Sequence, residues 1–143
     1  MTNGTRGTLD RRIREHYDDI LVLSSMVEQS LTQAVQTLQK RDVALAREVY
    51  ANDDNINDKR YEIEEKVLTT VATQQPAARD LRILASLLDV AGELERMGDY
   101  AKGIARINIR LGDHPPLRPL KQIPKMAEIT VDMLHRAVSA FID

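Results

Sequence analysis

The chain contains no cysteine, no tryptophan and a single phenylalanine among its 143 residues. The absence of cysteine excludes disulfides, thiolate metal sites and cysteine nucleophiles. So few aromatic residues are poorly suited to the core of a β-sheet, whereas the abundant Ala, Leu, Ile, Arg and Glu are typical of long amphipathic helices. We therefore expect an all-α protein, an antiparallel bundle of long helices.

Long apolar runs and an excess of positive charge are also missing. No run approaches the roughly 20 apolar residues that cross a bilayer, and residues 1–8 lack the apolar core of a signal peptide. The net charge of -2 provides no general field that would attract nucleic acid. We expect a cytoplasmic protein that is peripheral to the membrane at most and binds no nucleic acid.

Catalytic motifs are absent as well. The sequence has no Gly-rich phosphate loop, no Ser-His-Asp arrangement and no recognisable nucleophile motif. A bundle of long helices also gives no sequence sign of a concave substrate pocket. We therefore expect a protein that is not an enzyme.

Apolar residues recur at steps of three and four along three long segments, which predicts three helices after a flexible tail over residues 1–8. One face of the third segment is expected to hold Leu81, Leu84, Leu88, Ala91, Gly98 and Ala105. Turns at residues 41–42 and 75–76 would fold the three segments into a bundle over residues 9–110. The predicted helices span Leu9 to about Lys40, Val43 to about Thr73 and residue 77 to about Arg110.

Four of the five prolines lie in residues 111–124, which we expect to form an extended linker. A fourth helix is predicted over residues 125–143, with an apolar face made of Met126, Ile129, Met133, Ala137 and Ala140. This helix either completes a four-helix bundle, swaps onto another chain or begins a second unit.

Four oxygen-bearing side chains are expected to meet between the second and third helices. Asp53 lies about 22 residues before the turn and Asp99 about 23 residues after it, so these two side chains are expected at the same height of the bundle. Asn57 and Glu95 form a second pair, each about 19 residues from the turn. Residues at i and i+4 share a helix face, so the four side chains would form one cluster. Oxygen-rich clusters of this kind suit hard or borderline cations.

A second interpretation of this cluster is a polar layer that fixes the register of the helices. In it, Glu95 and Asp99 are neutralised by one of the arginines at positions 60, 79, 82 and 96. Spacing alone does not distinguish this layer from a metal site. Three of these arginines, Arg79, Arg82 and Arg96, also belong with Lys102 and Arg106 to a charged stripe. The stripe is either a surface for a partner or phosphate or a solvated helix face.

Two long motifs point to a known family. Residues 75–82 read QPAARDLR, and residues 93–105 read ELERMGDYAKGIA. They resemble the third helix of the PhoU family of phosphate-signalling and phosphate-transport accessory proteins, with Met97 in place of Ile. Asp53, Ile56 and Asn57 match the family's second-helix pattern, and the resemblance extends over residues 9–143.

The resemblance implies an all-helical protein of two similar three-helix bundles. This chain has one such unit and the first helix of the next, as a piece of a longer chain or a short form that pairs with itself. Asp53, Glu95 and Asp99 match motifs that can bind iron or zinc clusters, whereas Asn57 stands where many members have Asp.

By the same resemblance, the function would be regulatory. The resemblance implies an adaptor that represses phosphate-starvation signalling when phosphate is plentiful. It would do so by contacting a sensor histidine kinase and components of the phosphate ABC transporter. We expect the same of this chain, as a homodimer. The alternatives are a metal-binding or metal-storage bundle and a purely structural dimerisation bundle.

Overall fold

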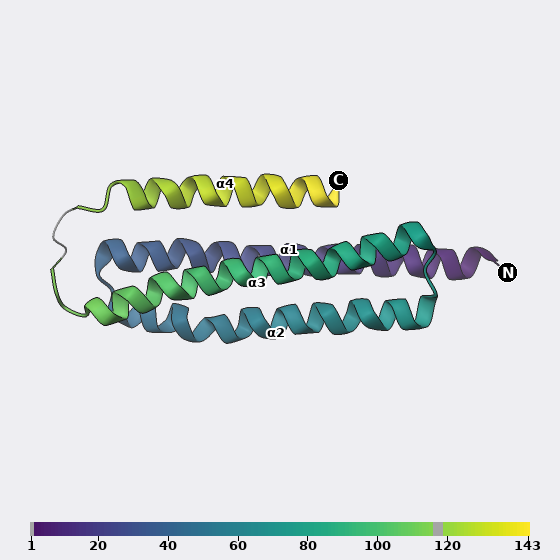
Figure 1. The fold of residues 1–143 in the computed structure, drawn as a ribbon, viewed down its shortest axis with the longest axis horizontal. Coiled ribbons are helices and arrows are strands. Elements are labelled where there is room, and N and C mark those ends of the chain that lie inside the picture. Colours follow the sequence, from purple (N-terminus) through teal and green to yellow (C-terminus); the bar gives the residue numbers. More distant parts are fainter. Residues whose placement is uncertain (1, 116–118) are drawn as a thin grey trace.

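The computed structural model describes residues 2–115 and 119–143, with side chains from Arg6 onward. Within these residues it contains the helices α1 (Thr2–Lys40), α2 (Val43–Gln74), α3 (Ala78–Leu111) and α4 (Gln122–Ile142). Consecutive helices run in opposite directions; α1, α2 and α3 pack against one another, and α4 lies along α1 (Figure 1). The predicted all-α bundle is confirmed. In the described ranges, no helix has both the length and the apolar character needed to cross a membrane.

Both predicted turns are present, and each has a local cause. Asp42 caps α2, because its carboxylate accepts a hydrogen bond from the backbone N–H of Leu45 at 2.9 Å. Arg41 precedes it with a φ of 57°, and its guanidinium donates to the carbonyls of Gly112 and His114 beyond α3. At the other end, Gln75 ends α2 in the left-handed region, and Pro76 prevents the helix from continuing.

The core consists of aliphatic side chains from the three long helices. Its fully buried members are Ile20, Leu23 and Val27 of α1, Ile56, Ile63 and Val67 of α2, and Leu84, Leu87 and Ala91 of α3. The predicted face of α3 was wrong at Leu81, which is 45% exposed. The buried row of α3 instead passes through Asp80 and Leu87, each one position before the predicted Leu81 and Leu88, and the carboxylate of Asp80 is turned inward to the guanidinium of Arg6.

The N-terminal part of α1 corrects a prediction. Helix α1 begins at Thr2, so the flexible tail predicted for residues 1–8 was wrong for those that the structure describes. Arg6 supplies a physical reason, because its guanidinium lies 2.9 Å from the carboxylate of Asp80 in α3 and 3.2 Å from that of Asp10. The contact with Asp80 joins residues 74 positions apart, which helical spacing does not reveal.

The linker is shorter than predicted. Helix α3 continues through Leu111 and α4 already begins at Gln122, while residues 116–118 of the predicted linker lie outside the described residues. Pro124 lies in the first turn of α4. A proline is tolerated there because the first N–H groups of a helix have no partner within it.

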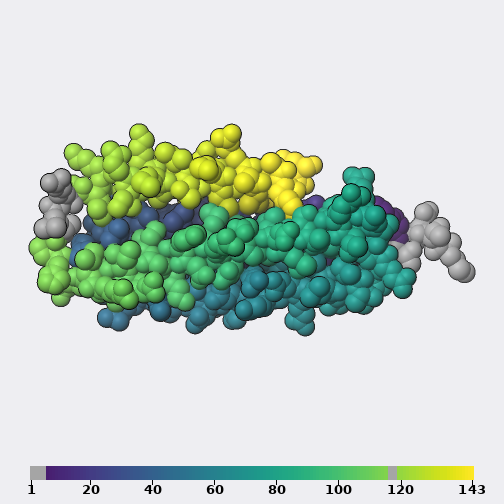
Figure 2. Space-filling view, in the orientation of Figure 1, coloured from purple at the N-terminus to yellow at the C-terminus, as the bar shows by residue number. Residues whose placement is uncertain are grey.

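Helix α4 packs only against α1 among the described elements. Leu134 and Val138 are buried in this contact, and atoms of α1 remain visible between α4 and α3 in the space-filling view (Figure 2). The apolar face predicted for α4 points elsewhere, with Met126 64%, Ile129 52% and Met133 62% exposed. It is therefore uncovered within the described part of the chain.

The position of the core along α3 is testable with two leucines one turn apart. Leu84→Ala should lower the free energy of unfolding by about 2 to 5 kcal/mol, because the fully buried side chain leaves a cavity. Leu81→Ala removes the same atoms from an exposed position and should cost less than about 0.5 kcal/mol. Urea unfolding followed by circular dichroism measures both, and equal losses would contradict the described register of α3.

Candidate functional site

The carboxylate of Asp53 is the most buried charge between α2 and α3. Its side chain is 1% exposed, and its Oδ2 atom lies 2.9 Å from the ammonium of Lys102. The Asn57 side-chain amide donates to the same oxygen at 3.4 Å. Oδ1 of Asp53 has no hydrogen-bond partner in the described structure. A buried carboxylate is costly without a partner, so the ammonium of Lys102 compensates for the burial of Asp53.

Gly98 brings α3 close to this carboxylate. A Cβ atom at position 98 would lie 3.1 Å from Cγ2 of Ile56 and 3.6 Å from Oδ1 of Asp53. The absence of a side chain therefore permits α3 to approach α2 at this height. Gly92 and Gly103 show no such constraint, because a Cβ at either position would meet nothing within 4 Å.

Glu95 and Asp99 complete the predicted cluster from α3. Burial raises the pKa of Glu95, and the negative charge of Asp99 raises it further, while the charge of Arg60 acts in the opposite direction. Asp53 and a hydrogen bond with Asp99 also contribute to the raised pKa. The spacing argument predicted this grouping, and the charges of Asp99 and Asp53 do act on Glu95. It overstated their burial, because Glu95 is only partly buried and Asp99 is exposed.

The arrangement as it stands does not fit a metal ion. Among the described residues, no three histidine, aspartate or glutamate side chains are placed to hold one. The ammonium of Lys102 already supplies a cation to Asp53. The predicted iron or zinc cluster therefore remains a prediction that this geometry does not favour. The contacts fit a polar layer whose members differ from the predicted ones: Lys102 pairs with Asp53, and of the four predicted arginines it is Arg60 whose charge acts on Glu95.

The structure does not bring the three predicted partner-binding arginines together. All three are exposed on α3, and Arg79 and Arg96 are separated by about 25 Å of helix. The guanidinium of Arg82 donates to the carbonyl of Ala78 at 3.2 Å, and that of Arg96 lies 3.4 Å from Glu93. Arg79 and Arg82 lie together near the turn between α2 and α3, whereas Arg96 is paired with Glu93 farther along the helix.

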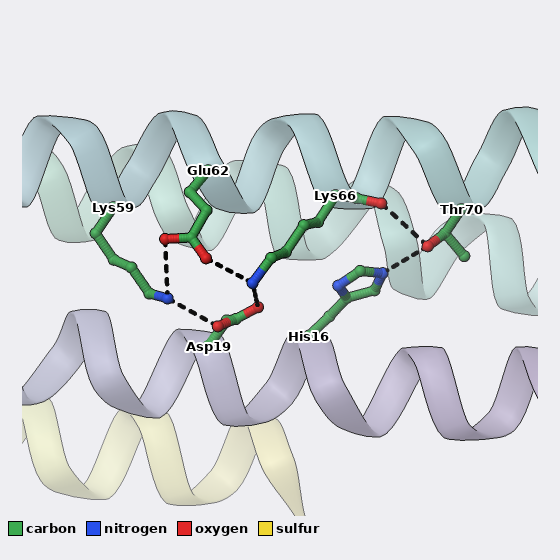
Figure 3. Close-up of polar contacts among 6 residues, drawn as sticks. All are labelled: His16, Asp19, Lys59, Glu62, Lys66 and Thr70. Atoms are coloured by element: carbon green, nitrogen blue, oxygen red, sulfur yellow. Dashed lines mark hydrogen bonds and ion pairs between the residues drawn. The ribbon is translucent and has the colours of Figure 1, made fainter.

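A second polar network, between α1 and α2, was missed in the sequence (Figure 3). Asp19 of α1 binds the ammonium groups of Lys59 at 2.8 Å and Lys66 at 3.1 Å, and Glu62 bridges the same two lysines. Burial would raise the pKa of Asp19, but the hydrogen bonds from the two lysines outweigh it and lower the pKa. The available signal was the opposite charges at positions 59, 62 and 66, which share one face of a helix.

His16 lies beside this network and is 2% exposed. Its Nε2 atom is 2.8 Å from the hydroxyl of Thr70, and its Nδ1 atom has no partner in the described structure. Burial lowers the pKa of His16 and outweighs the opposing charges of Asp19 and Glu15. The neutral imidazole therefore serves as a packed, hydrogen-bonded part of the α1–α2 contact.

Residues 10–107 match the family model described as the PhoU domain. The chain belongs to the PhoU family. It is 34% identical over 134 residues to the phosphate-specific transport system accessory protein PhoU homolog of Aquifex aeolicus, covering 94% of this chain and 61% of that protein. It is 31% identical over 137 residues to the accessory protein PhoU of Escherichia coli (strain K12), covering 94% and 56%.

A PhoU homolog of Clostridium acetobutylicum is 31% identical over 140 residues, covering 97% of this chain and 64% of that protein. The chain thus spans less than two thirds of the length of each of these PhoU proteins. The PhoU match covers α2 entirely and α3 as far as residue 107, so it includes every member of the carboxylate cluster and Lys102.

The partnership between Lys102 and Asp53 predicts a clear stability effect in this PhoU domain. Lys102→Met should lower the free energy of unfolding by about 1 to 3 kcal/mol, because it leaves a buried polar group unpaired. Asp53→Asn in the same background should recover part of the loss by removing the unpaired charge. Lys125→Met, at an exposed position of α4, is the matched control and should have little effect. Thermal and urea unfolding measure all four proteins.

The same variant tests the conflict with metal binding. After equilibrium dialysis against zinc, the unmodified protein should hold no zinc that depends on Asp53, whereas Lys102→Met should retain more. The reason is that the substitution removes the ammonium that competes for the carboxylate. Zinc bound by the unmodified protein and lost in Asp53→Asn would instead support the predicted metal cluster.

The raised pKa of Glu95 predicts a pH dependence. The folded protein holds a proton on Glu95 more tightly than the unfolded chain, so stability falls as the pH rises from the ordinary value of 4.5 through the folded pKa. Glu95→Gln should therefore stabilise the protein at pH 7, and the gain should shrink as the pH falls through that window. Glu93→Gln, on the exposed side of α3, should show no such dependence. Unfolding free energies at pH 4 to 8 decide the matter, and a destabilising Glu95→Gln at pH 7 would contradict it.

Proposed function

We propose that this chain is a regulatory accessory protein of phosphate uptake that acts through protein contacts. In this proposal it lies in the cytoplasm and represses phosphate-starvation signalling by binding a sensor histidine kinase and components of the phosphate ABC transporter. The observation that carries the proposal is the match of residues 10–107 to the PhoU domain. The relatives named above are phosphate-specific transport system accessory proteins.

The surface chemistry supports binding rather than catalysis. The most buried carboxylate of the α2–α3 contact is paired with Lys102, that of Asp19 with Lys59 and Lys66, and the sequence has no recognisable nucleophile motif. A rigid helical bundle can present fixed charges to a partner without rearranging its backbone. Contact with the kinase and transporter is therefore assigned to exposed helix faces.

Arg79 and Arg82 are our candidates for such a face. Both are exposed at the start of α3, and neither forms an ion pair in the described structure. Exposed charges at a protein interface mainly affect association and the choice of partner. An acidic surface on the kinase or on the transporter ATPase would be the complementary partner. The proposed homodimer is supported by the uncovered apolar face of α4.

The test is complementation in a bacterial strain lacking its resident PhoU, with alkaline phosphatase as the reporter of starvation signalling. The chain should lower reporter activity in phosphate-rich medium. Arg79→Glu/Arg82→Glu should lose most of this repression, and its pull-down of the kinase or the transporter ATPase should weaken about tenfold, a change of about 1.4 kcal/mol. Arg14→Glu, at an exposed position of α1, is the control for a reversed charge.

Circular dichroism shows whether each variant keeps its helices. Full reporter activity with a folded, unmodified chain would overturn the accessory role. Repression that survives the double charge reversal would keep the role and exclude Arg79 and Arg82 as the contact.

A further inference from the structure

Three arginines without a carboxylate partner in the described structure converge on one surface depression. The N-terminal part of α2 lies beside the C-terminal end of α3 (Figure 1). The depression between them has a volume of about 450 Å³. Arg47 and Tyr50 line it from α2, and Arg106, Ile109 and Arg110 line it from α3. Most other basic side chains in the long helices of this protein, such as Lys59 and Lys66, have acidic partners.

The arginines repel one another in the free protein. Lys102, Arg106 and Arg110 follow at intervals of four residues, so they share one face of α3, where like charges are unfavourable. The charge of Lys102 is offset by Asp53 at 2.9 Å. The charges of Arg106, Arg110 and Arg47 are not offset in this way. The chain has 22 acidic and 20 basic residues, so an excess of basic residues in the sequence does not explain this cluster of positive charge.

Tyr50 gives the depression a fixed wall. The ammonium of Lys102 lies 4.9 Å from the centroid of the Tyr50 ring, a cation–π distance, and so holds the ring against α3. Ile109 adds apolar surface on the other side. The site thus offers guanidinium groups from two helices, a phenol and a hydrophobic patch within a volume that is usual for small-molecule sites.

Asp99 limits where an anion can lie. It lines one neighbouring depression with Tyr50, Lys102, Gly103 and Arg106, and another with Arg96, Arg106 and Arg110. An anion would be repelled there. The favourable position is therefore the depression that Arg106 and Arg110 share with Arg47, which Asp99 does not line.

We propose that this depression binds a phosphate group, either as free inorganic phosphate or as a small phosphate ester. The planar guanidinium forms paired hydrogen bonds with phosphate oxygens, which makes clustered arginines suited to this ligand. Tyr50 and Ile109 would contact the organic part of an ester. The inference goes beyond the proposed accessory role and does not depend on it, because it follows from the charge distribution of α2 and α3 alone.

Isothermal titration calorimetry with inorganic phosphate and with adenosine monophosphate tests the site. Binding should weaken at least about tenfold in Arg106→Gln/Arg110→Gln, since each charge-assisted hydrogen bond that is lost accounts for roughly a tenfold change. Arg47→Gln should weaken binding as well, which tests the contribution of α2. Arg79→Gln/Arg82→Gln changes the net charge equally at the far end of α3 and should leave the affinity unchanged.

Each outcome has a definite meaning. Tighter binding of adenosine monophosphate than of inorganic phosphate would identify an ester as the ligand, and the reverse would identify the free ion. Absence of binding of both ligands at millimolar concentration, or equal affinity in Arg106→Gln/Arg110→Gln, would overturn the proposal. The complementation assay reports separately on the accessory role, so either conclusion can fail without the other.

Discussion

The burial of Asp53 is the constraint on which the contact between α2 and α3 depends. A carboxylate that is 1% exposed must keep a cation nearby, and Lys102 can provide one because its long side chain reaches inward while remaining 28% exposed. The approach of the two helices then requires the absence of a side chain at Gly98. The buried charge thus explains the lysine at position 102, and the close approach of Ile56 explains the glycine at position 98.

Polar contacts of the same kind recur at other heights of the bundle. Arg6 binds Asp80 near one end, and Asp19 holds Lys59 and Lys66 farther along. At the opposite end, the buried amide of Asn108 donates to the carbonyl of Thr37 at 2.9 Å. Aliphatic side chains alone would allow long helices to slide past each other at little cost, whereas each of these contacts forms at one register only.

The sequence reveals the helices better than it reveals their partners. The steps of three and four residues predict α1, α2 and α3. Equal distances from the turn at residues 75–76 pair Asp53 with Asp99 and Asn57 with Glu95 in one cluster, and the charges of Asp53 and Asp99 both act on Glu95. Lys102 escaped this argument because a flexible side chain can reach a carboxylate that its backbone position does not face. The Asp19 network and the pair of Arg6 with Asp80 depend on how α1 is rotated against its neighbours, and periodicity along one helix does not fix that rotation.

The charge on one side of α3 changes from negative to positive along the helix. The carboxylate cluster and the arginine depression are therefore neighbours on α3. Glu95 and Asp99 come first, and Lys102, Arg106 and Arg110 follow toward the C-terminal end. The helix dipole favours cations in the last turn, so it offsets part of the repulsion at Arg110 but little of that at Arg106, one turn earlier. Lys102 lies at the boundary, with its ammonium bound to Asp53 and stacked on Tyr50. The same lysine pairs with the buried carboxylate of Asp53 and contacts the Tyr50 ring that lines the arginine depression. A substitution that moves Lys102 is therefore expected to alter both sites.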